Sequence, residues 1–90
     1  MRQFCEVYVA KHCFGTDEAI RIAEEVKLRI PDVQINLRIL DDMPAQDAAV
    51  VSATPAYYLN GRLLFLGNPR VEELVARIAF HSQQKGENDD

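Results

Sequence analysis

The residues with the clearest chemical potential lie in the segment Lys11–Thr16, which contains Cys13. An apolar run, Phe4–Ala10, precedes this segment and predicts a β-strand, and a periodic helix reaching about Ile30 follows it. A cysteine between a strand end and a helix start lies near unpaired N–H groups and the positive end of the helix dipole. Both features stabilise the thiolate, the form that attacks disulfides and binds metals. Cys13 is therefore the predicted nucleophile.

The neighbours of Cys13 act in both directions on its thiolate. Lys11 and His12 favour the charged form if their side chains turn inward, whereas Asp17 and Glu18 disfavour it if they lie close. Lowering a thiol pKa from ~8.5 to ~7 gives only about a threefold faster attack at pH 7, because nucleophilicity falls with basicity. Positioning of the target disulfide must therefore supply most of any catalytic effect.

The second cysteine, Cys5, lies inside the predicted first strand and is expected to be a small core residue. Extended chain separates it from the end of that strand by roughly 17 Å, so a disulfide with Cys13 is not expected. Two unpaired cysteines, with no recognisable signal peptide, predict a reducing, cytoplasmic setting. The cysteines, His12 and His81 lack zinc-ligand spacing, and no metal or cofactor is expected. An iron–sulfur cluster bridged by Cys13 across a dimer stays open.

The totals describe a single small domain. The chain has 90 residues and a net charge of −4, so no basic surface predicts nucleic-acid binding. No apolar run approaches the ~20 residues needed to cross a bilayer. We expect a folded domain over residues 1–81 and a disordered polar and acidic tail over residues 82–90, in a monomer or weak homodimer.

Hydrophobic periodicity and turn signals predict an α/β order of strand, helix, strand, short helix, strand, strand and helix. Asn60-Gly61 indicates a hairpin, and Asn68 with Pro69 indicates a capped helix start. The later elements are expected at Val33–Ile39, Pro44–Ala49, Ala56–Leu59, Arg62–Leu66 and from Pro69 onward. These elements form a four-stranded mixed sheet with the first strand central, the second at an edge, and helices on both faces.

This order resembles the thioredoxin-like superfamily, and three local matches carry the resemblance. Cys13-Phe14-Gly15-Thr16 falls where that family has Cys-x-x-Cys, and Thr54-Pro55 falls on its cis-proline. Asn60-Gly61-Arg62 with Gly67 matches its final hairpin and the glycine that follows. Thr16 followed by Asp17 and Glu18 is the stronger local signal for the start of the first helix. The resemblance instead implies a helix that begins directly after Cys13, with Gly15 in its first turn, and we expect this second start. It also implies a cis bond before Pro55 and a backbone at Thr54 that pairs with an extended partner.

The chain departs from the family at its active centre. Thr16 replaces the resolving cysteine, His12 replaces the preceding tryptophan, and Val7 falls near the family's buried aspartate. The Cys-x-x-Ser arrangement of monothiol glutaredoxins resembles Cys13 to Thr16, so Thr16 is expected to offer its hydroxyl to the sulfur or to the helix end.

Two functions follow from this pattern. In the first, Cys13 attacks a protein or small-molecule disulfide, Thr16 supports the sulfur, and Phe14, His12, Thr54 and Pro55 shape the substrate groove. An external thiol must then release the mixed disulfide. In the second, the same Phe14–Pro55 surface binds a protein without catalysis. Tyr8-Val9-Ala10 and Ala53-Thr54-Pro55 also resemble segments of the thioredoxin-like domains of circadian-clock proteins, which keeps the adaptor function open.

Overall fold

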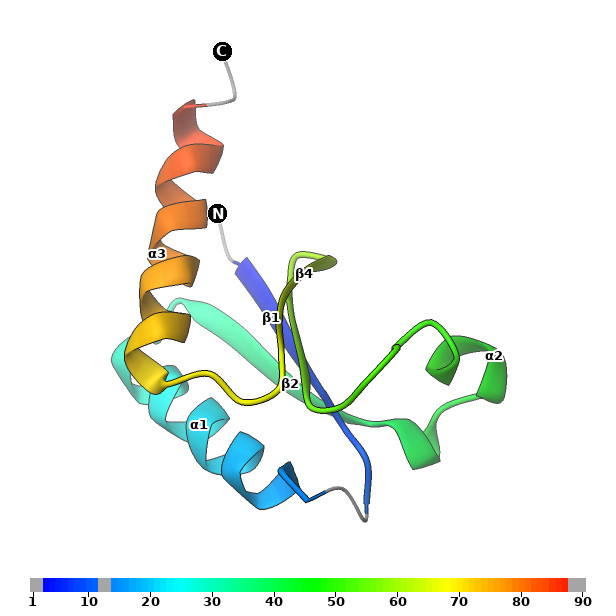
Figure 1. The fold of residues 1–90 in the computed structure, drawn as a ribbon. Helices are drawn as coiled ribbons and strands as arrows, with labels where there is room; N and C mark the ends of the chain where they lie inside the picture. Colours follow the sequence, from blue (N-terminus) through cyan, green and yellow to red (C-terminus); the bar gives the residue numbers. More distant parts are fainter. Residues whose placement is uncertain (1–2, 12–13, 88–90) are drawn as a thin grey trace.

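The computed structural model describes residues 3–11 and 14–87 (Figure 1). Its elements, in order, are β1 (Gln3–Val9), α1 (Thr16–Arg29), β2 (Val33–Ile39), the 3-10 turn η1 (Leu40–Asp42), α2 (Ala45–Ala48), β3 (Ala56–Leu59), β4 (Arg62–Leu66) and α3 (Val71–Glu87). Apart from η1, this is the predicted order of strands and helices.

The four strands form one mixed sheet in the order β2-β1-β3-β4, which places β1 at the centre and β2 at an edge as predicted. β1 pairs with β2 in parallel and with β3 in antiparallel fashion. The β3–β4 hairpin turns through Asn60 at φ 52° and Gly61 at φ 85°. Two successive positive φ angles match the twist of the flanking strands, which explains why Asn-Gly occupies this turn.

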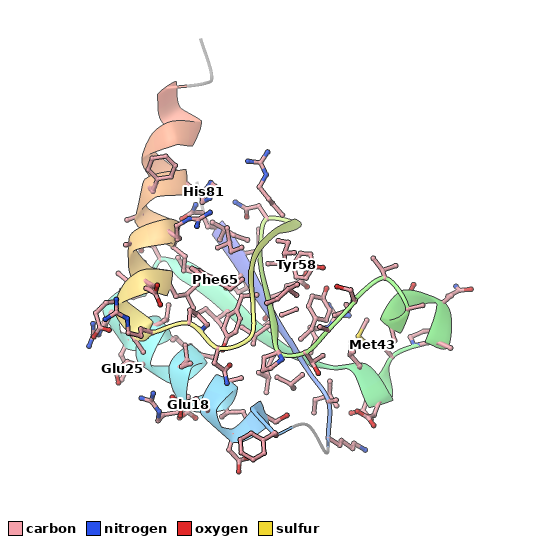
Figure 2. The ribbon with its side chains drawn as sticks, viewed as in Figure 1. Glu18, Glu25, Met43, Tyr58, Phe65 and His81 are labelled. Atoms are coloured by element: carbon pink, nitrogen blue, oxygen red, sulfur yellow. The ribbon has the colours of Figure 1, made fainter. Side chains whose placement is uncertain are left out.

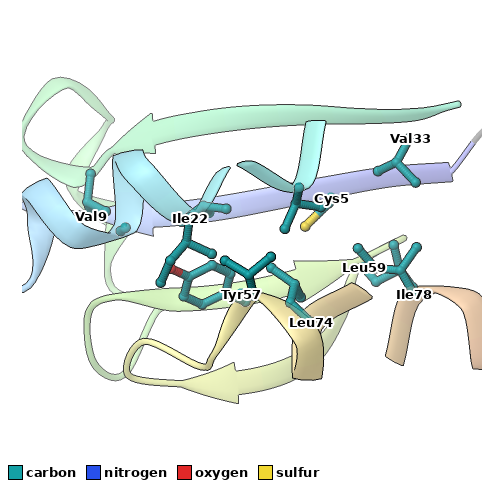
Figure 3. Packing of buried hydrophobic residues seen from close by; sticks show 12 residues of the cluster. Cys5, Val9, Ile22, Val33, Tyr57, Leu59, Leu74 and Ile78 are labelled. Carbon is teal, nitrogen blue, oxygen red and sulfur yellow. The ribbon is translucent and has the colours of Figure 1, made fainter. Parts of the chain in front are cut away.

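The core lies between one face of the sheet and the two long helices, α1 and α3 (Figures 1 and 3). Alternation along β1 directs every second side chain to this face, and helical spacing directs an apolar stripe of each helix to meet it. The best-buried members are Cys5, Val7, Val9, Ile22, Val26, Tyr57, Leu74 and Ile78. Truncation of a fully buried leucine such as Leu74 to alanine should cost about 2–5 kcal/mol of stability.

The opposite face of the sheet has a thinner cover. α2 lies on that side (Figure 1), and none of its residues is buried. Figure 2 shows Tyr58 on the α2 side of the sheet and Phe65 on the side of α3, where Arg77 stacks over the Phe65 ring. Phe4, on the α2 side of β1, is 47% exposed. Because both faces of β1 are mostly apolar, we expect both to be buried by helices. The four-residue helix α2 leaves the Phe4 side of β1 partly exposed to solvent.

Both long helices have ends that local chemistry explains. α1 ends at Arg29, and Ile30 donates its N–H to the Val26 carbonyl before Pro31 stops the helix. α3 continues to Glu87, so the helix extends beyond Ser82, where the sequence predicts the start of a disordered tail. Residues 88–90 of that predicted tail lie outside the described residues. Within the described part of the chain, no helix combines the length and apolar character needed to cross a membrane.

Candidate thiol site

His12 and Cys13 lie outside the described residues. The described part of the candidate site consists of three segments: Phe14–Thr16 at the start of α1, the Thr54–Pro55 turn before β3, and Asn68 between β4 and α3. The Thr54–Pro55 peptide bond is cis, as the sequence predicts.

α1 begins at Thr16, with Gly15 as its N-cap residue. The expectation that the helix begins directly after Cys13, with Gly15 inside its first turn, is wrong. Ala19 donates its N–H to the Gly15 carbonyl at 3.0 Å, which is the first hydrogen bond of the helix. The acidic residues Asp17 and Glu18 occupy the first turn, where the helix dipole favours negative charge. These local preferences determine the helix start.

Thr16 closes the loop between β1 and α1. Its hydroxyl donates a hydrogen bond of 2.6 Å to the carbonyl of Ala10, just beyond the end of β1. A hydroxyl carries one hydrogen, so in this structure the Thr16 hydroxyl donates to the backbone and not to a sulfur atom. Thr16 thus holds the two ends of the segment that contains Cys13 together.

Gly15 packs tightly against Pro55. A Cβ atom on Gly15 would lie 3.2 and 3.3 Å from two ring carbons of Pro55 and 2.9 Å from Nδ2 of Asn68. Distances this short are rare for real Cβ atoms, so any larger residue here would force the Asn68 side chain or the Pro55 ring to shift. The contact brings the start of α1 against the proline before β3.

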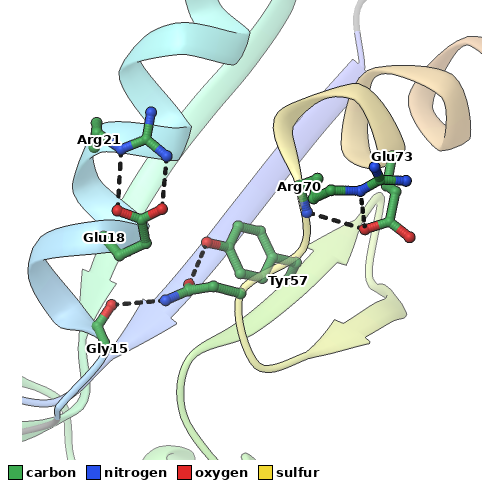
Figure 4. Close-up of polar contacts among 7 residues, drawn as sticks. Gly15, Glu18, Arg21, Tyr57, Arg70 and Glu73 are labelled. Atoms are coloured by element: carbon green, nitrogen blue, oxygen red, sulfur yellow. Dashed lines mark hydrogen bonds and ion pairs between the residues drawn. The ribbon is translucent and has the colours of Figure 1, made fainter.

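Asn68 joins this contact to the core through two hydrogen bonds (Figure 4). Its Nδ2 donates to the Gly15 carbonyl at 3.0 Å, and its Oδ1 accepts from the Tyr57 hydroxyl at 2.7 Å. The prediction that Asn68 caps α3 is wrong. The N–H of Arg70 instead binds the side chain of Glu73 at 3.0 Å, and Leu74 donates its N–H to the Arg70 carbonyl at 3.1 Å. Asn68 takes part in neither of these bonds at the start of α3.

The charged groups near the site are largely paired. The backbone N–H of Lys11 donates to Oδ1 of Asp41 at 2.9 Å, and its ammonium group lies 3.4 Å from Asp42. Glu18 accepts two hydrogen bonds from Arg21, at 3.0 and 2.6 Å, and these lower the Glu18 pKa (Figure 4). The negative charge of Asp42 therefore opposes the expected stabilisation of a thiolate by the Lys11 ammonium group.

Phe14 and Pro55 differ sharply in exposure. Phe14 is fully exposed, so its ring does not fold back onto the core, whereas Pro55 is buried. Thr54 is half-buried. An exposed aromatic ring directly after Cys13 offers an apolar contact to a binding partner.

Cys5 is a buried, free thiol in the core, as predicted. Burial raises its pKa to about 12, with a smaller contribution from the charge of Glu6. α3 continues past His81, and the Nε2 of this histidine is buried without a hydrogen-bond partner among the described residues. In the part of the chain that the structure describes, which leaves out His12 and Cys13, no three potential ligands gather around a metal position.

A groove of about 470 Å³ runs beside Asn68 between α1 and α3. Arginine and glutamate side chains line it, and its three arginines, Arg21, Arg29 and Arg70, are each ion-paired with a glutamate. The paired charges give this groove little electrostatic preference for an anion or a cation.

No protein-family model and no curated protein sequence matches the chain. Solved structures do match. Oxidised thioredoxin from Plasmodium falciparum superposes with a TM-score of 0.70 at 14% identity, covering 87% of this chain and 82% of that one. Thioredoxin from Fasciola hepatica gives 0.65 at 21% identity, covering 84% and 80%.

A third match comes from structural work on the thiol resolving mechanism in yeast mitochondrial 1-Cys peroxiredoxin via glutathione/thioredoxin systems. It has a TM-score of 0.65 at 22% identity and covers 80% of this chain and 74% of that one. The chain has a thioredoxin-like fold. At these identities the similarity establishes the fold alone.

Within this thioredoxin-like fold, the sequence predicted a site that includes Phe14, Thr16, Thr54 and Pro55. It did not predict the contact of Gly15 with Pro55, or the role of Asn68 and Tyr57. Tyr57 occurs in a strand that any apolar residue could fill, and its buried hydroxyl is the one sign that a polar partner is needed. Asn68 carries a strong local capping signal, which pointed to the wrong partner.

Proposed function

We propose that this thioredoxin-like chain is a monothiol redox protein in which Cys13 exchanges with a disulfide. The observation that carries the proposal is the anchoring of Gly15, two residues after Cys13, against Pro55 and Asn68. Two trans peptide units span at most about 7.6 Å between Cα atoms. The thiol therefore has a short covalent tether to the anchored start of α1.

The reaction involves two exchanges. The Cys13 thiolate attacks one sulfur of a disulfide, a mixed disulfide forms, and the other sulfur leaves as a thiolate that takes a proton from water. Thr16 stands where an intramolecular attacker would be needed. An external thiolate, from a protein or a small molecule, must attack the mixed disulfide and release the Cys13 thiolate. We assign this chemistry to a reducing, cytoplasmic setting, in keeping with the free thiol of Cys5.

The residues around the site support positioning more than strong activation. The positive end of α1 favours the Cys13 thiolate, but Asp17 and Glu18 lie in the same helical turn. Thr16 contributes by closing the loop through Ala10. Phe14 offers an exposed apolar contact to the disulfide partner. His12 remains a proposed contact to that partner on the ground of its sequence position alone.

The test is the pH dependence of Cys13 alkylation by iodoacetamide, followed by peptide mass spectrometry so that Cys5 is read separately. We expect an apparent pKa of Cys13 below ~8.5, the value of a free thiol. We also expect a mixed disulfide with glutathione after incubation with glutathione disulfide, and none in Cys13→Ser. An apparent pKa of Cys13 at or above ~8.5, or the absence of a mixed disulfide with glutathione, overturns the proposal.

A non-catalytic adaptor is the second candidate, and the full exposure of Phe14 favours it. An adaptor would bind its protein partner through the Phe14 ring without needing the thiol. Binding that survives Cys13→Ser but is lost in Phe14→Ala supports the adaptor. Loss of binding in both variants supports the redox function.

A further inference from the structure

Asn68 connects the core to the thiol loop with a defined orientation. A backbone carbonyl can only accept hydrogen bonds, so the amide nitrogen of Asn68 must face Gly15 and its oxygen must face Tyr57. The Tyr57 hydroxyl is then the donor in its own bond. Tyr57 is fully buried at the centre of the core, so it provides a rigid base for the amide.

The two hydrogen bonds of Asn68, to Gly15 and to Tyr57, connect segments that are far apart in the sequence and do not stabilise the loop of Asn68 alone. Asn68 does not cap α3, because Arg70 and Glu73 satisfy the start of that helix. Its amide instead reaches a residue 53 positions earlier in the chain, and that residue is the N-cap of α1. The Gly15 carbonyl thus accepts one bond from its own helix and one from Asn68.

We infer that Asn68 is a positioning residue for the Cys13 thiol, because it holds the start of α1 against Pro55 through the Gly15 carbonyl. This inference rests on the proposed thiol chemistry of Cys13. Asn68 does not act on the sulfur. It determines where the first N–H groups of α1 lie relative to the two-residue tether that ends at Cys13. Tyr57 acts one step further back by orienting the Asn68 amide.

The test compares Asn68→Ala, Tyr57→Phe and the double variant in the full chain. Asn60→Ala is the control, because the N–H of Phe4 donates to Oδ1 of Asn60 at 2.9 Å, in the β3–β4 turn, so this variant also loses a side-chain hydrogen bond of an asparagine. Loss of the bond between Asn60 and Phe4 should lower the stability of the protein without changing a contact of the loop that contains Cys13. The readouts are the pH profile of Cys13 alkylation and the rate of exchange with glutathione disulfide.

We expect Asn68→Ala to raise the apparent pKa of Cys13 and to slow alkylation at pH 7 by about threefold. Exchange with glutathione disulfide should fall more, by about tenfold, because it also needs the incoming disulfide to be aligned. Tyr57→Phe should move both readouts in the same direction by less. The double variant should be no slower than Asn68→Ala alone, because Tyr57 acts through Asn68.

An alkylation profile of Asn68→Ala that matches wild type overturns the inference, as does a double variant whose effects simply add. Equal profiles for Asn68→Ala and Asn60→Ala would assign Asn68 to stability alone. Should Asn68→Ala fail to fold, Tyr57→Phe decides the matter, because it keeps the ring in the core. Wild-type protein that alkylates but never exchanges overturns the proposed function. The alkylation comparison still decides the role of Asn68 in that case.

Discussion

The amide nitrogen of Asn68 lies 3.0 Å from the carbonyl oxygen of Gly15, and this hydrogen bond connects the loop before α3 to the N-cap residue of α1. The contact is local in space and remote in sequence. It places three segments, around Gly15, Pro55 and Asn68, in one small region.

Gly15→Ala should destabilise the protein although alanine suits the backbone at this position. The φ angle of Gly15 is −94°, so a Gly-to-Ala change would by itself stabilise the fold by about 0.4–1 kcal/mol. The new Cβ would, however, lie 2.9 Å from Nδ2 of Asn68 and 3.2 Å from the Pro55 ring. Losing the Asn68 bond costs about 1 kcal/mol, and overpacking costs about 1–3 kcal/mol.

We therefore expect Gly15→Ala to lower the free energy of unfolding by about 1–3.5 kcal/mol in urea titrations. In an Asn68→Ala background the cost should shrink by about 1 kcal/mol, because the displaced amide is already gone. Equal costs in the two backgrounds would show that the contact with Pro55, and not the Asn68 bridge, limits the size of residue 15.

Cys5 should make the protein less stable at alkaline pH. Its pKa is raised from 9.0 to about 12 in the folded state, chiefly by burial. The folded state therefore favours the neutral thiol, and this contribution is complete below pH 9 and is lost as the pH rises toward 12. By pH 12 this effect of Cys5 lowers the free energy of unfolding by about 4 kcal/mol.

Urea titrations between pH 8 and about pH 11 should show a steeper fall in stability for wild type than for Cys5→Ala. Burial also raises the pKa of Tyr57, which contributes in the same direction in both proteins. The comparison of slopes, not of absolute stabilities, isolates Cys5. Parallel slopes would mean that the Cys5 thiol ionises as readily in the folded state as in the unfolded chain.

Thr16→Cys should create a Cys-x-x-Cys pair with Cys13. Oxidation should then remove two thiols from a thiol titration, and the variant should reduce insulin disulfides with dithiothreitol as the reductant. Thr16→Ser is the control, because it keeps a hydroxyl that can donate to the Ala10 carbonyl as Thr16 does. Two thiols that stay free after oxidation would place the residues too far apart for a disulfide, which needs Cα atoms within about 7 Å.

Gln3→Met should stabilise the protein. Gln3 is 8% exposed, and its Nε2 is buried without a hydrogen-bond partner among the described residues. An unsatisfied buried polar group costs about 1–3 kcal/mol, and methionine fills a similar volume. We expect a gain of about 1 kcal/mol in thermal or urea unfolding. Gln34→Met, at an exposed position of β2, should stay within about 0.5 kcal/mol of wild type.

Local chemistry along the chain was sufficient for the elements themselves. The alternation in β1 and β2, the Asn60-Gly61 turn and the stop at Pro31 each depend on residues that are adjacent in the chain. The start of α1 belongs to this group as well. Thr16 with Asp17 and Glu18 indicates a helix that begins at Thr16, and the structure has this start. The start directly after Cys13, which was expected from the family resemblance, is wrong.

The contacts around the thiol loop required the tertiary structure. Asn68 carries the sequence signature of a helix cap, but its partners are Gly15, 53 residues away, and the Tyr57 hydroxyl. A side-chain amide binds whichever groups the fold brings within about 3 Å, and nothing in the neighbouring residues reveals them. Composition and periodicity thus determined the strands, the helices and the presence of Cys13 between them. Only the tertiary structure decided that Gly15, the buried Pro55 and Asn68 are in contact, because that contact depends on distances between segments that no local preference encodes.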